Sequence, residues 1–125
     1  KINNYLRLSV PDLKKIIEIY NKYKDISLIC GLIHGGQRNK YDIHYITYDF
    51  ETLKEILEST GFYDIQIYNP FEFLSHENDD YSKATIPHMD PCGNIMSLNI
   101  ICKKKNDVNI NDITLSNKLK KIFKL

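Results

Sequence analysis

The chain has 125 residues and a net charge of +1, and 42% of its residues are hydrophobic, which is enough for the core of one small domain. It contains no run of about 18 apolar residues and does not open with a basic and then apolar leader, so we expect no membrane span, no secretory signal and a cytoplasmic location. Three cysteines without C-x-x-C spacing predict reduced thiols rather than a disulfide framework or a zinc ribbon.

Positive charge is concentrated near the C-terminus, where residues 103–125 hold seven lysines and two aspartates. Phe123 is the only aromatic residue among them, so the segment lacks the stacking groups of a single-strand binding surface. We expect a solvated basic helix and no nucleic-acid partner. We therefore divide the chain into a folded portion, residues 1–105, and a basic tail with a short helix, residues 106–125.

The first half of the chain predicts a strand followed by helices. Residues 5–10 alternate apolar and polar side chains, which is the two-residue period of a strand. Pro11 ends this strand, and apolar positions within residues 11–23 recur at helical spacing. A second apolar run, residues 26–33, stops at two consecutive glycines and is followed by a polar loop.

The second half predicts one more helix and two strands. Asp49 is a good N-cap for a helix that ends at Gly61. Residues 63–69 predict a strand with Ile65 and Ile67 inward, and the next 24 residues or so read as an acidic loop. Residues 95–102 predict a last strand that is covered on both faces. This order of elements is typical of an α/β fold, with a small sheet whose first strand has an open edge.

Four segments of the chain carry a family resemblance. They are SVPD at residues 9–12, HGGQ at residues 34–37, YDFETLKEILESTGF at residues 48–62 and DDYSKATIPHMD at residues 79–90. In this combination and order they resemble the C-terminal half of a family of class I, Rossmann-like S-adenosylmethionine-dependent methyltransferases. The resemblance covers nearly residues 2–103.

The resemblance implies the C-terminal, substrate-side part of a Rossmann-like methyltransferase sheet, flanked by helices. It implies the strand order 5–10, 95–102, 63–69, with the last strand of the chain antiparallel. S-adenosylmethionine is the implied cofactor, but no strand here is followed by a glycine-rich turn and a ribose-binding acid, so no residue is assigned to the cofactor. We expect a chain that is inactive alone and pairs with an N-terminal half or with copies of itself. The expected acceptor is a small molecule or a sugar.

Methyl transfer to oxygen or nitrogen requires a base or an acceptor that orients the nucleophile. The polar residues in and around the resembling segments supply such groups. The end of the first strand and the start of the last strand meet at one edge of the predicted sheet, and we also expect Ser9 and Asp12 at this edge. We predict the catalytic residues His88, Asp90 and His34, and the substrate-binding residues Gln37, His44, Asp80 and Tyr81. Each has a structural alternative, since a histidine can bond a loop carbonyl and an aspartate can cap a turn or a helix.

Two other functions stay open. The open sheet edge would suit a non-catalytic remnant that pairs with another chain. The loop also holds ligand types for a divalent ion in a metal-dependent hydrolase, although their spacing matches no usual ligand motif; these are His76, Asp79, Asp80, His88 and Asp90.

Overall fold

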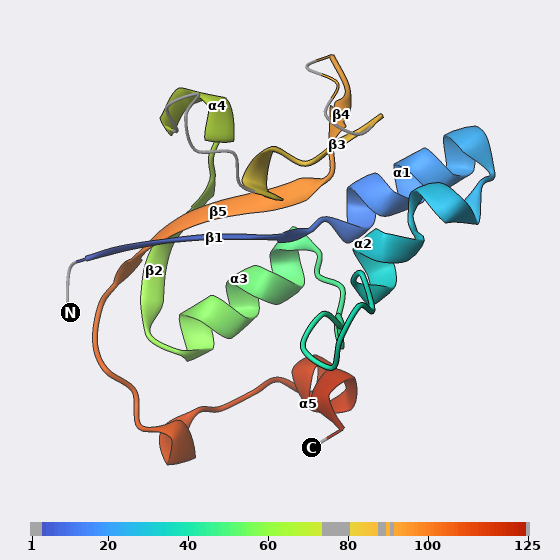
Figure 1. Ribbon diagram of the computed structural model, residues 1–125. Coiled ribbons are helices and arrows are strands. Elements are labelled where there is room, and N and C mark those ends of the chain that lie inside the picture. Colours follow the sequence, from blue (N-terminus) through green and yellow to red (C-terminus); the bar gives the residue numbers. More distant parts are fainter. Residues whose placement is uncertain (1–3, 74–80, 88–89, 91, 125) are drawn as a thin grey trace. The chain divides into compact units, whose positions relative to one another are not determined.

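The computed structural model describes residues 4–73, 81–87, 90 and 92–124 (Figure 1). The chain forms two compact units. The first unit comprises Lys1–Leu8, Phe50–Tyr68 and Ile100–Leu125, and the second comprises Ser9–Asp49 and Asn69–Asn99. The predicted boundary after residue 105 falls inside the first unit.

A three-stranded sheet is built from β1 (Tyr5–Pro11), β2 (Phe62–Ile67) and β5 (Ser97–Lys104) in the order β1-β5-β2. β2 pairs antiparallel with β5. Hydrogen bonds from Lys104 N to Asn4 O (3.0 Å) and from Asp12 N to Met96 O (2.9 Å) make β1 antiparallel to β5 as well. The predicted strand order, with the last strand antiparallel, is therefore confirmed.

The fold is a mixed α/β structure with a small antiparallel sheet, and this corrects one part of the prediction. The parallel ladders of a Rossmann-like sheet are not supported by the described strands. The reason is topological: β5 lies between β1 and β2, the two strands that share a direction, so both ladders of this sheet are antiparallel.

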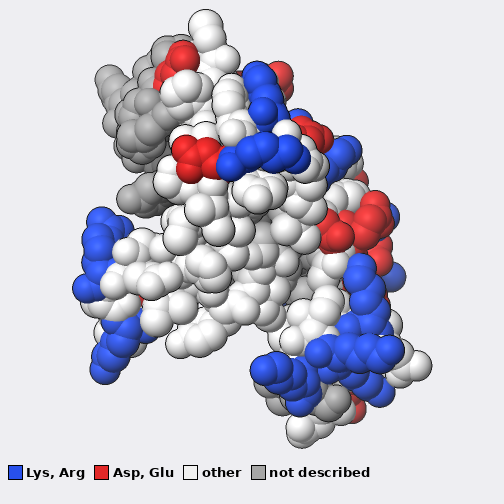
Figure 2. Space-filling view, turned by 90° about the vertical axis from the view of Figure 1, so that its right-hand side faces the viewer, with Lys and Arg blue, Asp and Glu red and all other residues white. Residues whose placement is uncertain are grey.

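The first unit places helix α3 (Phe50–Ser59) against β2. α3 starts directly after Asp49, buries Leu53 and Leu57, and gives way to Gly61, whose φ of 85° is the left-handed conformation expected there. The short terminal helix α5 (Asn117–Phe123) is capped by the hydroxyl of Ser116, which accepts a hydrogen bond from Leu119 N at 3.2 Å. The single-turn 3₁₀ helix η3 (Ile110–Asp112) precedes it. Figure 2 shows lysine and arginine side chains exposed on one face of the protein, with acidic side chains beside some of them.

Strand β2 departs from the predicted strand in one respect. Its register with β5 shifts between Tyr63 and Gln66, and Asp64 within this bulge has a φ of 51°. The Asp64 carboxylate accepts a hydrogen bond from Lys103 Nζ at 2.6 Å. The inward placement of Ile67 is wrong: this side chain is 62% exposed because it is the last residue of an edge strand, whereas Ile65 is half-buried.

The second unit has a core between helices and the start of β5. Helix α1 (Leu13–Tyr23) is followed by the 3₁₀ helix η1 (Ile26–Leu28) and by α2 (Cys30–His34). Asp12 caps α1, since its Oδ1 accepts a hydrogen bond from Lys14 N at 2.9 Å. The buried cluster comprises Ile16, Ile19, Ile29 and Met96, with Leu32, Ile33 and Ile86 packed against it.

The segment predicted as a long loop contains short elements. They are α4 (Pro70–Phe73), η2 (Tyr81–Lys83), β3 (Thr85–Ile86) and β4 (Asn94–Ile95), and β3 pairs antiparallel with β4. Tertiary hydrogen bonds produce this order, because Met96 N donates to Ala84 O at 2.9 Å and the buried Asn99 amide donates to Ser82 O at 2.9 Å.

Two of the sequence predictions concern membrane-spanning segments and the state of the cysteines. No helix among the described residues has both the length and the apolar character needed to cross a membrane. Cys30, Cys92 and Cys102 are all free, and burial raises the pKa of the Cys102 thiol.

Candidate functional site

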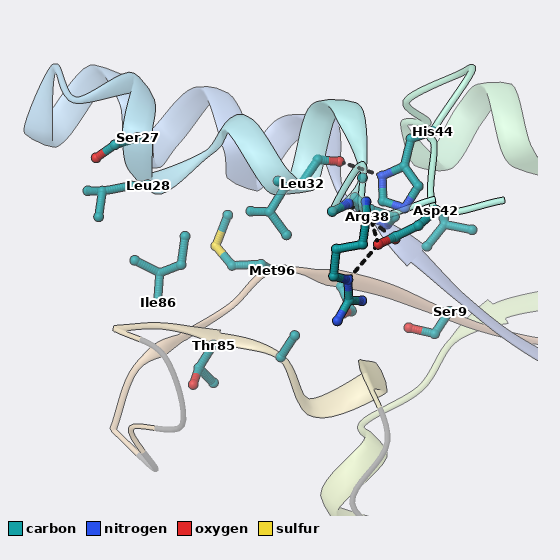
Figure 3. Close-up of a pocket in the computed structure, with 17 residues that line it drawn as sticks. Ser9, Ser27, Leu28, Leu32, Arg38, Asp42, His44, Thr85, Ile86 and Met96 are labelled. Carbon is teal, nitrogen blue, oxygen red and sulfur yellow. Dashed lines mark hydrogen bonds and ion pairs between the residues drawn. The ribbon is translucent and has the colours of Figure 1, made fainter. Parts of the chain in front are cut away.

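A pocket of about 610 Å³ lies within the second unit (Figure 3). This volume is in the usual range for small-molecule sites. Its walls come from the C-terminal end of β1, from η1 and α2, from the loop after α2, from β3 and from the start of β5. The pocket thus borders the sheet edge at which β1 ends and β5 begins.

The pocket has an apolar end and a charged end. Figure 3 shows Leu28 and Ile86 at one end, with Leu32 and Met96 towards the middle. Arg38, Asp42 and His44 lie at the other end, and all three come from the loop after α2. Among the described lining residues, Arg38 is the only lysine or arginine and Asp42 the only carboxylate.

Two glycines allow this loop to fold back on itself. Gly35 has φ 77° and ψ 178°, a conformation that is essentially restricted to glycine. A Cβ atom at Gly35 would lie 2.6 Å from Asp42 O, and a Cβ atom at Gly36 would lie 2.5 Å from Asp42 Oδ2. The close packing of residues 35–36 on Asp42 therefore depends on the absence of side chains.

Asp42 is the centre of the loop's hydrogen bonds. Its carboxylate accepts from Arg38 Nε at 2.7 Å and from Gly36 N at 3.2 Å, and its carbonyl oxygen accepts from Gln37 N at 2.8 Å. The Arg38 hydrogen bond first, and then the Gly36 N–H, hold the pKa of Asp42 below its ordinary value. The Asp42 side chain is 24% exposed and that of Arg38 is 75% exposed. A partly buried carboxylate thus holds an accessible guanidinium in place.

This arrangement predicts a pH dependence of stability. Because the folded pKa of Asp42 lies below the ordinary value of 3.8, its stabilising contribution is present above that value and is lost as the pH falls through the folded pKa. We expect Asp42→Asn to lower the free energy of unfolding near neutral pH and to reduce its decline between about pH 5 and about pH 2. Urea unfolding of both proteins at the two pH values measures this, and an identical decline in both would contradict it.

His44 presents a basic nitrogen at the same end of the pocket. Its Nδ1 lies 2.9 Å from Leu32 O, and its backbone N–H donates to His34 O at 3.1 Å. A carbonyl oxygen can only accept a hydrogen bond, so Nδ1 carries the proton and Nε2 of the neutral ring has the free lone pair. His44 is therefore held in the tautomer that a proton acceptor at Nε2 requires.

The structure distributes the other predicted site residues over several places. His34 ends α2, Gln37 follows in the left-handed region with φ 52°, and neither is among the described residues that line the pocket. Asp90 caps a turn, because its Oδ1 accepts from Cys92 N at 2.9 Å. Tyr81 begins η2. Asp80 and His88 lie outside the described residues, and the roles assigned to all six stay predictions.

The pair Arg38 and Asp42 was missed at the sequence level. A signal existed, since two opposite charges stand four residues apart, the first of them two positions after two consecutive glycines. Ser9, which was expected at the rim, does line the pocket, whereas Asp12 caps α1. Within the described ranges, no three metal-binding side chains come together, and the predicted ligands His76, Asp79, Asp80 and His88 lie outside those ranges.

The pocket as a whole combines an apolar wall, an exposed cation and an imidazole with a fixed tautomer. Such a set can hold an organic molecule and accept a proton from one of its groups. No family model matches the chain, and neither a curated protein nor a solved structure matches it.

Proposed function

We propose that this chain is the C-terminal, substrate-side part of a class I S-adenosylmethionine-dependent methyltransferase that acts on a small-molecule or sugar acceptor. The strand order β1-β5-β2, with β5 antiparallel between the other two, carries the proposal, because it is the order that the sequence resemblance implies. The position of the pocket supports it further. Ser9, Val10 and Pro11 at the carboxyl end of β1 line the pocket, and in the parallel sheets of Rossmann-like proteins, to which the proposal assigns β1, ligands bind beyond such ends.

The methyl donor is assigned to a site outside these 125 residues. The chain has no strand that is followed by a glycine-rich turn and a ribose-binding acid, so its residues do not fit the cofactor. The proposal therefore requires a cofactor-binding part on another segment or on another chain. This chain supplies the acceptor side of the site.

His44 is the proposed base on the acceptor side. Its Nε2 would accept the proton from the hydroxyl or amine group that becomes methylated, while Leu32 O keeps the proton on Nδ1. His44 is exposed and its ring makes one hydrogen bond to the backbone, so its removal should leave the fold largely intact.

The test begins with the coding sequence upstream of Lys1 and uses the longest natural product. We expect a strand, a glycine-rich turn and an acidic residue about twenty positions further on. Purified product should transfer labelled methyl groups from S-adenosylmethionine to a small-molecule extract, and His44→Gln should lower the turnover by about 10²-fold or more. The turnover of His34→Gln is measured in the same assay, so that the effects of replacing the two histidines of this region can be compared.

The possible outcomes distinguish the methyltransferase assignment from the role of His44 as the base. A product that binds no S-adenosylhomocysteine and transfers no methyl group overturns the proposed function and favours an interaction module that pairs through the open edge of β1. If the enzyme is functional and His44→Gln leaves its turnover unchanged, His44 is not the base, but the methyltransferase assignment still holds.

A further inference from the structure

The two ends of the pocket differ in chemistry, and this difference restricts what can bind. A neutral, polar molecule such as a simple sugar would leave Leu28, Leu32 and Ile86 without apolar contacts and would offer no charge to Arg38. A purely apolar molecule would bury the guanidinium without a hydrogen-bond partner from the ligand. The lining therefore favours a molecule that has both an apolar part and an anionic part.

We propose that the pocket binds an acceptor with an apolar body and an oxyanion group, a carboxylate or a phosphate, which Arg38 recognises. This inference deepens the proposed function. Only the description of the bound molecule as a methyl acceptor rests on that function, because binding to the pocket does not require a methyl donor. The oxyanion would lie at the end formed by Arg38, and the apolar body would extend along Met96 and Leu32 towards Ile86 and Leu28 (Figure 3).

Arg38 is suited to this task by its position. Its Nε is engaged by Asp42 at 2.7 Å, which orients the planar guanidinium, yet three quarters of the side chain remains accessible. A guanidinium has several N–H groups in a fork geometry that matches carboxylate and phosphate oxygens, and the exposure of Arg38 keeps its side chain within reach of a ligand. In Figure 3 the Arg38 side chain extends from the loop past Asp42 towards the space bordered by Met96 and Ser9.

Asp42 does not prevent anion binding. Its carboxylate oxygens accept hydrogen bonds from N–H groups of its own loop, those of Gly36 and Arg38. The ion pair lowers the net charge that a ligand meets, so recognition would depend on hydrogen bonds from the guanidinium. The hydroxyl group of Ser9 also lines the pocket and can add a hydrogen bond to an oxyanion or to a polar substituent. The pocket thus contains a donor for an anion in addition to the guanidinium.

The test uses probes that differ only in the group at one end. Octanoate and octanamide share an eight-carbon body and differ in charge, octyl phosphate replaces the carboxylate by a phosphate, and methyl α-glucoside represents a neutral sugar. Titration of ¹⁵N-labelled protein followed by NMR reports affinity and location together. We expect octanoate to bind with a Kd of about 1 mM, about tenfold more tightly than octanamide, with shifts at the amides of Gly36, Arg38 and Thr85.

Variants assign the preference to the arginine. Arg38→Gln should reduce the preference for octanoate over octanamide from about tenfold to about none, because the charged fork is lost. Arg38→Lys retains the charge without the planar fork and should retain part of the preference. Arg7→Gln is the matched control, since it removes the same charge from an exposed position on β1 that does not line the pocket.

Each result either supports or overturns the proposed recognition of an anion by Arg38. A preference for the anion that disappears in Arg38→Gln and survives in Arg7→Gln supports the inference, and the ratio of octyl phosphate to octanoate identifies the oxyanion. Equal affinity for octanoate and octanamide, an unchanged preference in Arg38→Gln, or tighter binding of methyl α-glucoside at the same amides overturns it. None of these probes involves a methyl donor, so failure here is distinguishable from failure of the proposed function.

Discussion

Replacing Ile16 by alanine is expected to lower the free energy of unfolding by about 2–5 kcal/mol, which is a large part of the stability of a domain of this size. Ile16 is 2% exposed and belongs to the buried cluster of the second unit, together with Ile19, Ile29 and Met96. Truncation would remove three carbon atoms and leave a cavity among side chains that include part of the pocket wall. Urea unfolding followed by circular dichroism measures the change.

The neighbouring residue supplies the control. Ile17 stands on the same helix α1 and is 50% exposed, so Ile17→Ala should cost less than about 1 kcal/mol. Equal losses for the two variants would show that the buried cluster is not where the stability of this unit lies. Ile16→Ala should also weaken octanoate binding at temperatures at which the variant is still folded, because Met96 and Ile86 would lose a packing partner.

Replacing Gly35 by alanine is expected to disrupt the loop that forms the charged end of the pocket. The new Cβ would stand 2.6 Å from Asp42 O and 3.1 Å from His44 N, and the backbone conformation is one that alanine rarely adopts. We expect a loss of about 1–3 kcal/mol in the free energy of unfolding. NMR should show large shifts for the amides of residues 36–44 and an anion preference that is reduced at least as far as in Arg38→Gln.

Gly31→Ala is the matched control on the preceding helix. Gly31 lies inside α2, and a Cβ atom there would meet nothing within 4 Å. Alanine is favoured over glycine in a helix by about 1 kcal/mol, so this variant should be as stable as the natural protein or more stable. A Gly35→Ala protein with unchanged stability and unchanged loop amides would refute the role given to the backbone at residue 35.

Much of the fold could be predicted because its signals are local. The alternation in residues 5–10, the helix that begins after Asp49 and the left-handed Gly61 each depend on a few neighbouring residues, and each is present in the structure. The strand order followed from the resemblance rather than from any local pattern. Ile67 was misplaced because exposure at the end of an edge strand depends on what lies beside it. The short strands β3 and β4 were missed because two-residue strands have no periodicity to detect.

The site was predicted less completely, for a physical reason. Two adjacent glycines indicated unusual backbone angles, and Gly35 and Gly36 do line the pocket. The pairing of Arg38 with Asp42 and the contact of His44 with Leu32 O arise only when the loop folds back on α2. Such contacts depend on the path of the chain between the residues, which spacing alone does not determine.

The position of β5 has a consequence for how the protein is made on the ribosome. β1 and β2 have no ladder with each other in the described structure, and within it each pairs only with β5, which follows both of them in the sequence. While residues before Ser97 are being synthesised, both strands have emerged without their partner, and Asp12 cannot yet bond Met96. The sheet must therefore close late, and β1 joins β5 through contacts between residues more than eighty positions apart. Until then β1 and β2 lack the partner strand that they have in the folded chain, and unpaired strand edges of this kind favour aggregation.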